Sequence, residues 1–271
     1  MSSSPIGLFD SGVGGLSVLR EVRRELPEER TVYVADSRFA PYGDRDAGFI
    51  EARADAIVRF LLTKGVKAVV VACNTATGLA VERLRATFDL PIVAIEPAVK
   101  PAAALTKSGV VGVLATSATL GSERFSDLVD RHGGSVRVIE QPCPGLAQQV
   151  EAGDLAGPGT RALVERYVAP LVAEKADTIV VGCTHYTFLT PLIQELAGPS
   201  VTIVDPAPAV ARELRRRLAA ANLLADAASG RGREEFWTSG DPVQVGRLIR
   251  QLWGPLWVPG TTVHGMPDRY A

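Results

Sequence analysis

The sequence predicts an α/β protein built from two similar halves, and three observations support this fold class. Short runs rich in Val and Ile alternate with helix-like stretches in the first half of the chain. The same order of runs recurs in the second half. The length of 271 residues, with 46% hydrophobic and 22% charged side chains, suits a globular chain of two domains or of one large α/β domain.

The first half contains four apolar runs that we expect to form buried strands. They are continuous rather than alternating, which is typical of parallel strands covered on both faces. The runs are PIGLFD (5–10), TVYVAD (31–36), KAVVVAC (67–73) and PIVAIE (91–96). Residues 15–26 and 47–64 place apolar side chains at helical spacing between them. This βαβα order predicts a doubly wound parallel sheet with right-handed crossovers.

The second half repeats this plan and predicts an internal duplication. The corresponding runs are SGVVGVLATS (108–117), SVRVIEQPCPG (135–145), ADTIVVGCTHYT (176–187) and VTIVDPA (201–207). Their spacing along the chain is nearly that of the first four runs, as Gly7 and Gly112 or Cys73 and Cys183 illustrate. Any two α/β units share Val-rich strands, but that does not explain a cysteine at the same strand end in each half.

The last quarter of the chain departs from the repeat. Residues 208–225 are helix-like, and the Gly, Ser and Arg of residues 226–234 predict an exposed loop. EFWTSGDPVQVGRLIRQLWG then predicts a short strand, a turn and an amphipathic helix. The Pro- and Gly-punctuated tail from Pro255 supports no prediction. The arginines of residues 212–218 are expected on an exposed helix face.

Charge and composition argue against several classes of partner. Lys plus Arg (29) nearly balance Asp plus Glu (30), so the net charge of −1 offers no general attraction for nucleic acid or an anionic membrane. The first residues, MSSSPIGLFDSG, lack the basic and apolar regions of a signal peptide, and no apolar stretch is long enough to span a membrane. We therefore expect a cytoplasmic protein whose three cysteines are free thiols.

Cys73 and Cys183 are the strongest candidates for chemistry. Both lie at the carboxyl ends of predicted strands, where open α/β sheets bind their ligands. If the halves face each other, the two thiols stand on opposite sides of one cleft. A helix N-terminus after each cysteine would favour the thiolate. One thiol could then remove a proton from a carbon while the other returns a proton to the opposite face, which inverts the carbon without a cofactor.

Other roles for these cysteines are weaker. A lone free cysteine usually packs as a small hydrophobe, but the matched positions in a duplicated frame favour function. Zinc held by Cys73, Cys183 and His185 is disfavoured because the usual ligand spacing is missing, so we expect no metal. Cys143 has no counterpart in the first half and is interpreted as structural.

Three further features carry polar side chains near the predicted strand ends. DSGVGG (10–15) lacks the spacing of a nucleotide-binding loop, so its glycines are expected to let the backbone approach a small ligand, with Asp10 contacting an ammonium group. His185 is interpreted as an acid/base partner of Cys183. Glu151 is by default a solvated helix residue.

DSGVGG, APYG, CNTA and GCTHY in this order resemble the glutamate racemases of the cofactor-independent aspartate/glutamate racemase superfamily. The similar stretches are 6–19, 33–43, 70–77, 111–122, 150–155, 180–189, 204–207 and 238–242. The resemblance implies two α/β domains related by a pseudo-twofold axis, with the active site in the cleft between them. It implies a first domain of residues 1–97 plus 208–271 and a second of residues 98–207, and a homodimer as the habit of the family.

The resemblance also implies the roles of individual residues. Cys183 would remove the α-proton of L-glutamate and Cys73 that of D-glutamate. Asp10 and His185 would assist the first and the second thiol, and Glu151 would be a further acidic assistant, although GLAQQ (145–149) before it departs from the family pattern. The substrate-holding positions would be Asp10, Ser11, Tyr42, Gly43, Asn74, Thr75, Thr116, Thr119, Thr184 and His185.

The predicted function is therefore cofactor-independent racemisation of glutamate, which in the family supplies D-glutamate for peptidoglycan. None of the four motifs DSGVGG, APYG, CNTA and GCTHY contains Lys or Arg, so hydroxyl, amide and backbone N–H groups would hold both carboxylates. A racemase for aspartate or another small acid is the nearest alternative, because one methylene gives only modest discrimination. A periplasmic-type binding protein is a second alternative, disfavoured by the missing signal peptide and the duplicated thiols.

Overall fold

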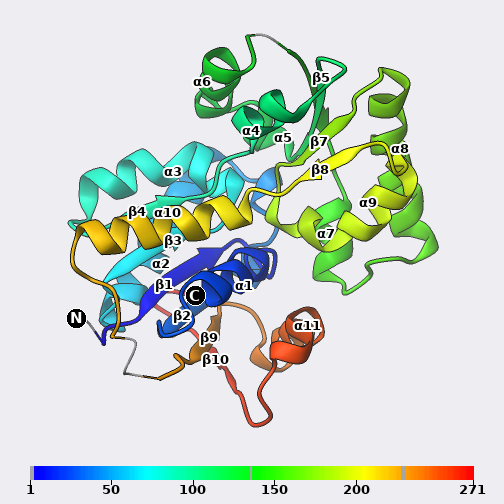
Figure 1. The fold of residues 1–271 in the computed structure, drawn as a ribbon. Coiled ribbons are helices and arrows are strands. Elements are labelled where there is room, and N and C mark those ends of the chain that lie inside the picture. The colour runs from blue at the N-terminus through cyan, green and yellow to red at the C-terminus, as the bar shows by residue number, and fades with distance from the viewer. Residues whose placement is uncertain (1–2, 135, 227–229) are drawn as a thin grey trace.

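Two parallel β-sheets form the centre of the computed structural model, which describes residues 3–134, 136–226 and 230–271 (Figure 1). The first sheet has the order β10-β9-β2-β1-β3-β4 and the second the order β6-β5-β7-β8. All paired strands are parallel. The strands are β1 (Ile6–Asp10), β2 (Thr31–Ala35), β3 (Ala68–Val71), β4 (Ile92–Ala94), β5 (Val110–Ala115), β6 (Arg137–Pro142), β7 (Thr178–Val181), β8 (Thr202–Val204), β9 (Glu234–Thr238) and β10 (Val263–Gly265).

Helices follow the strands and cover both sheets. The α-helices are α1 (Leu16–Glu25), α2 (Ala47–Thr63), α3 (Asn74–Thr87), α4 (Val99–Leu105), α5 (Ser117–Leu120), α6 (Glu123–His132), α7 (Leu146–Glu151), α8 (Pro158–Ala173), α9 (Thr190–Ala197), α10 (Ala207–Ala220) and α11 (Pro242–Trp253). Short 3₁₀ turns lie at Ser37–Phe39, Tyr42–Asp44, Thr184–Leu189 and Gly254–Leu256. The α/β class with two parallel sheets is thus confirmed.

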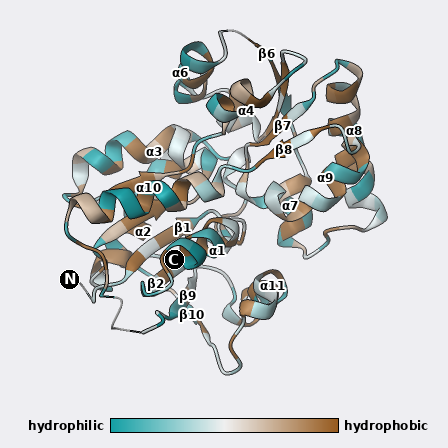
Figure 2. Ribbon diagram, in the orientation of Figure 1, coloured by the Kyte–Doolittle hydropathy of each residue, from teal (hydrophilic) through white to brown (hydrophobic). Residues whose placement is uncertain are grey.

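The duplicated plan is visible in the strand order. The central part of the first sheet, β2-β1-β3-β4, has the same connectivity as β6-β5-β7-β8. The inner strands β1, β3 and β7 are buried along their whole length, as their continuous apolar runs predict. Figure 2 shows brown, hydrophobic residues along strands of both sheets and teal, hydrophilic residues on surrounding helices such as α10.

The two sheets belong to two lobes that share apolar contacts. We call the lobe around the first sheet the first lobe and that around the second sheet the second lobe. Val13 and Leu16 of the first lobe belong to the same buried hydrophobic cluster as Leu146 and Leu189 of the second. Helix α4 contacts β5, β7 and α6, whereas α10 contacts α1 and β4. The domain boundaries at 97/98 and 207/208 stay a prediction.

The C-terminal segment adds two strands to the first sheet. β9 pairs with β2, and β10 pairs with β9 at the edge, so the segment returns to the first lobe. The sequence indicated β9 and α11 but not β10, because three residues between Pro- and Gly-rich stretches carry no usable periodicity. The loop expected over 226–234 includes residues 227–229, which lie outside the described residues.

Helix α10 is shorter than the predicted 208–225. Asn222 has a left-handed backbone with φ of 57°, and the N–H of Leu223 donates to the carbonyl of Leu218 at 2.8 Å. This geometry ends a helix. No helix within the described residues is both long enough and apolar enough to cross a membrane.

Candidate active site

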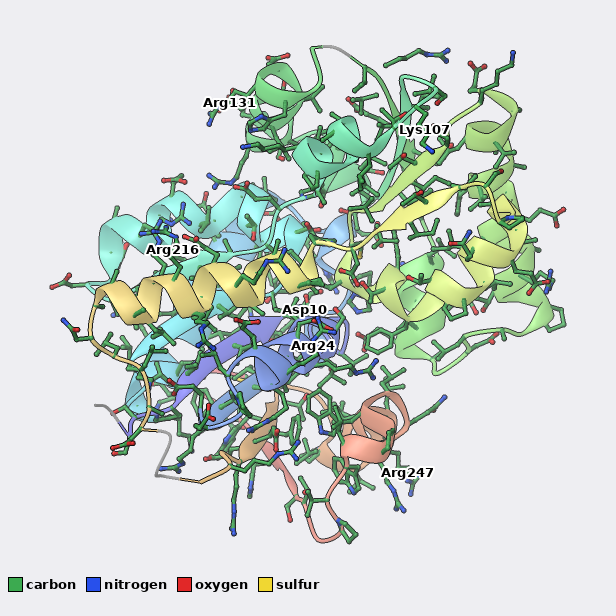
Figure 3. The ribbon with its side chains drawn as sticks, viewed as in Figure 1. Asp10, Arg24, Lys107, Arg131, Arg216 and Arg247 are labelled. Carbon is green, nitrogen blue, oxygen red and sulfur yellow. The ribbon has the colours of Figure 1, made fainter. Side chains whose placement is uncertain are left out.

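The candidate site lies where the carboxyl ends of the two sheets face each other. In each sheet the strand order reverses between two central strands, β1 and β3 in the first and β5 and β7 in the second. Asp10 ends β1 and Cys183 follows β7. Ligands of open α/β sheets bind at such reversal points. Figure 3 shows Asp10 at the junction of the first lobe with the green and yellow second lobe.

Cys73 caps helix α3 with its own sulfur. Its Sγ accepts a hydrogen bond from the N–H of Ala76 at 3.4 Å, and the residue is only 4% exposed. The sequence led us to expect that the helix N-terminus favours the thiolate. The N–H of Ala76 does lower the pKa of the Cys73 thiol, but burial and then the charge of Asp10 outweigh it and raise this pKa well above the ordinary value. Cys73 therefore carries its proton at neutral pH.

Cys183 faces a histidine that is held by a carboxylate. Its Sγ lies 3.8 Å from Nδ1 of His185, whose Nε2 lies 2.7 Å from Oε1 of Glu151. Burial lowers the pKa of His185, but the contacts with Cys183 and Glu151 and the charge of Asp10 outweigh it and raise this pKa well above 6.5. The histidine is therefore protonated at neutral pH and presents an N–H to the sulfur of Cys183.

Glu151 joins the two lobes rather than pointing into solvent. Its Oε1 also accepts the N–H of Val13 at 2.7 Å, and its side chain is only 17% exposed. The default interpretation of Glu151 as a solvated helix residue is therefore wrong.

The glycines of residues 10–15 make room for these side chains. A Cβ on Gly12 would lie 1.9 Å from Oε1 of Glu151, and a Cβ on Gly14 would lie 2.4 Å from Nδ1 of His185. Two side chains of the second lobe thus approach this turn closely, and the approach of a small ligand to it stays a prediction.

Asp10 is fully buried between the two cysteine environments. Its Oδ2 accepts the N–H of Gly15 at 2.9 Å, and the hydroxyl of Thr184 lies 3.5 Å from Oδ1. Nδ1 of His185 lies 4.0 Å from Oδ2. Burial raises the pKa of Asp10, and the nearby His185 and the N–H of Gly15 offset only part of this effect. Asp10 therefore contacts Thr184 and His185 beside Cys183, and its charge raises the pKa of Cys73.

Three threonine hydroxyls meet across the boundary of the lobes. Oγ1 of Thr75 lies 2.9 Å from Oγ1 of Thr116 and 3.2 Å from Oγ1 of Thr119, and the latter two lie 2.9 Å apart. Gly43 packs against Thr116 so closely that a Cβ would lie 2.9 Å from its Cγ2. This threonine triangle offers several O–H groups in one place, which suits a carboxylate.

Asn74 and Ser11 lie beside Cys73. Asn74 is only 4% exposed, yet neither its amide nitrogen nor its amide oxygen has a hydrogen-bond partner. A buried amide without partners costs about 1–3 kcal/mol, so this side chain is suited to a polar ligand. Ser11 is buried, and its N–H interacts with the sulfur of Cys73.

Tyr42 differs from the other predicted substrate-holding residues. Its hydroxyl donates to the buried carboxylate of Asp36, which also binds Arg53. The hydroxyl of Tyr42 is therefore engaged by Asp36 and is not available to hold a substrate. The sequence analysis did not single out Asp36 and Arg53. The available signal was that Arg53 lies on the same helical face as Ile50 and Ile57, which is an unusual place for a cation.

Cys143 is buried outside these contacts. Its Sγ donates to the carbonyl of Gln141 at 3.1 Å, and burial raises the pKa of its thiol. Among the residues that the structure describes, no group of three or more His, Cys, Asp or Glu side chains is arranged to hold a metal ion.

Comparison with known proteins gives one consistent family. Residues 6–214 match the Asp/Glu/hydantoin racemase family. The glutamate racemase of Methylococcus capsulatus is 56% identical over 249 residues, which cover 92% of this chain and 92% of that protein. The glutamate racemase of Stutzerimonas stutzeri is 51% identical over 253 residues, or 93% of this chain and 95% of that protein.

Solved structures agree with this family. A glutamate racemase isoform from Bacillus anthracis has a TM-score of 0.88 at 32% identity and covers 99% of both chains. The Escherichia coli glutamate racemase, solved in complex with L-glutamate and the activator UDP-MurNAc-ala, has a TM-score of 0.82 at 30% identity, with 96% of this chain and 97% of that chain covered.

Proposed function

Because this chain belongs to the Asp/Glu/hydantoin racemase family, we propose that it interconverts L- and D-glutamate, using Cys73 and Cys183 as two bases and no cofactor. Glutamate as substrate is supported by the curated relatives, which are glutamate racemases at 51–56% identity. In this family the product D-glutamate serves peptidoglycan synthesis.

The observation that carries this proposal is a pair of buried thiols with different polar neighbours. Cys73 holds its proton, whereas Cys183 faces a protonated His185. The two sulfurs are close enough that charge on Cys183 helps to raise the pKa of Cys73. One acid and one base on either side of a carbon are what inversion by proton transfer requires.

In the direction from L- to D-glutamate, Cys183 removes the α-proton, so the C–H bond breaks and an S–H bond forms. The thiol of Cys73 then gives its proton to the opposite face, which forms the new C–H bond. The electron pair left on the α-carbon is thus protonated from the other side. In this proposal the negative charge of the Asp10 carboxylate attracts the substrate ammonium group.

After this step the two cysteines have exchanged roles, and the enzyme is ready for D-glutamate. Cys73 is then the thiolate and Cys183 the thiol. Returning to the first state moves one proton onto Cys73 and one off Cys183. Asp10 is suited to carry a proton here, because its raised pKa lets it be protonated at a higher pH than an ordinary aspartate.

The substrate carboxylates are held by neutral groups in this proposal. Asn74 supplies an amide and the threonine triangle supplies hydroxyls. Aspartate is shorter by one methylene and would reach fewer of these groups, a difference of about 1–3 kcal/mol.

The experiment is a chiral assay of D-glutamate formed from L-glutamate, with L-aspartate as the competing substrate. We expect turnover of glutamate well above that of aspartate, and loss of racemisation in both Cys73→Ser and Cys183→Ser. Cys143→Ser is the matched control, as it changes the third thiol. Near-native turnover in either of the first two variants would refute the two-thiol mechanism.

A further inference from the structure

Arg53 is a nearly buried cation that contacts three separate segments of the chain. Its Nε and Nη2 donate to both carboxylate oxygens of Asp36, at 2.9 and 2.7 Å. Its Nη2 also donates to the carbonyl of Tyr270 at 2.8 Å, and its guanidinium lies 4.3 Å from the ring centroid of Phe39. Helix α2 thus holds the end of β2, the following turn and the C-terminal segment at one point.

The carboxylate of Asp36 in turn holds Tyr42. It accepts the hydroxyl of Tyr42, and Asp36 is fully buried while Tyr42 is 1% exposed. Burial, followed by the charge of Asp36, raises the pKa of Tyr42 well above its ordinary value, so this hydroxyl keeps the proton that it donates. The ring of Tyr42 therefore has one fixed position, and it cannot turn its hydroxyl toward a substrate.

Fixing the ring also fixes the backbone of the 3₁₀ turn Tyr42–Asp44. The first N–H groups of such a turn have no partner within it. The turn lies against the second lobe, because Gly43 packs on Thr116 and the carboxylate of Asp44 accepts the side-chain amide of Gln148 at 3.1 Å. These contacts place the turn, and with it its first N–H groups, beside the threonine triangle at the boundary of the lobes.

A buried ion pair is an expensive way to anchor a turn. Taking Asp36 and Arg53 out of water costs several kcal/mol for each ion, and apolar side chains of the same size often stabilise a protein as well. The pair does what apolar side chains cannot, since it accepts the Tyr42 hydroxyl and binds a carbonyl of the C-terminal segment in fixed directions.

We infer that Arg53 is a positioning residue for substrate binding, which acts through Asp36 and Tyr42 to hold the N–H groups of the Tyr42–Asp44 turn toward a substrate carboxylate. The C-terminal segment takes part through the carbonyl of Tyr270, and the ring of Tyr270 packs 5.7 Å from that of Phe60. This inference rests on the proposed function, because it assigns a carboxylate substrate to the turn.

The test compares Tyr42→Phe and Arg53→Met with the control Arg59→Met. Arg59 lies on the same helix and pairs with Asp55 on the surface. We expect both test variants to raise KM for L- and D-glutamate roughly tenfold, the effect of losing one hydrogen bond to a charged group, with kcat changed less than about twofold. Deuterium uptake of the peptide 37–46 should become faster, while that of the neighbouring helix does not.

Arg53→Met leaves the buried charge of Asp36 without its ion-pair partner and can prevent folding. Two other variants keep the inference testable. They are Tyr42→Phe, which keeps the ion pair, and a deletion of residues 267–271. An unchanged KM in folded Tyr42→Phe, or a lower melting temperature with unchanged KM, would overturn it. If the unmodified enzyme does not racemise glutamate, the proposed function fails, whereas unchanged deuterium uptake of peptide 37–46 in the variants would refute the anchoring itself.

Discussion

Replacing Glu151 by Gln should weaken the base on the Cys183 side of the site while leaving the fold intact. One oxygen of Glu151 serves both His185 and the N–H of Val13, each at 2.7 Å. The amide oxygen of a glutamine can still accept a hydrogen bond in that place, so the substitution removes mainly the negative charge. His185 then loses one of the groups that raise its pKa.

The size of the effect follows from these contacts. A hydrogen bond to a charged group contributes about 1.5–3 kcal/mol, and one pKa unit corresponds to about 1.4 kcal/mol. Because the Glu151 side chain is 17% exposed, solvent screens the charge only in part. We therefore expect the pKa of His185 to fall, and kcat/KM above neutral pH to fall roughly tenfold to hundredfold.

The assay measures kcat/KM in each direction as a function of pH, and circular dichroism of glutamate reports the rate of racemisation. The enantiomers have equal free energies, so the equilibrium constant is one and kcat/KM must be the same in both directions at every pH. The alkaline limb, which reports an essential acid of the free enzyme, should move to lower pH in Glu151→Gln. Glu165→Gln, on the exposed face of α8, is the control. An unchanged alkaline limb in Glu151→Gln would refute this reasoning.

The carboxylate of Glu151 should also affect how the free energy of unfolding depends on pH. The pKa of His185 is raised above its unfolded value of 6.5, so the folded protein binds the extra proton between these two pKa values. Its stabilisation is complete below pH 6.5 and is lost as pH rises through the folded pKa. Thermal unfolding should show a smaller loss of stability over this range in Glu151→Gln than in the unmodified protein. Equal pH dependence in both proteins would contradict the assigned contact.

Three further substitutions test other parts of the site. Gly12→Ala adds a methyl group 1.9 Å from Oε1 of Glu151, so it should displace this carboxylate and reproduce the kcat/KM profile of Glu151→Gln; a native profile would show that the contact is dispensable. Asn74→Ala removes a buried amide that has no partner, so urea unfolding should show unchanged or higher stability while KM rises about tenfold; a large loss of stability would contradict a substrate-binding role. Cys143→Ala should cost about 1 kcal/mol in urea unfolding and leave kcat within about twofold, and loss of turnover would give this thiol a part in the chemistry.

Much of the fold was predictable because its information is local. Continuous Val- and Ile-rich runs predicted the inner parallel strands, and their repetition predicted two sheets of one connectivity. Carboxyl ends of parallel strands meet at one edge of a sheet, so residues such as Asp10, Cys73 and Cys183 could be assigned to one region from the sequence alone.

The remainder depends on contacts between distant segments. No local pattern indicates that Gly12 leaves space for Glu151, a residue of the other lobe, or that Arg53 bonds the carbonyl of Tyr270. The direction of the Cys73 pKa also depends on such contacts. A helix N-terminus favours the thiolate, but burial and the neighbouring charge of Asp10 outweigh it, and neither can be read from residues adjacent to Cys73.

The central claim is that each thiol serves one enantiomer, and exchange of the α-proton in D₂O tests it most directly. In Cys73→Ser, Cys183 can still remove the proton of L-glutamate and return a deuteron to the same face. We predict deuterium in L-glutamate and none in D-glutamate for Cys73→Ser, and the reverse for Cys183→Ser, with no inversion in either. Exchange of both enantiomers in either variant, measured by NMR, would contradict the assignment of the two bases.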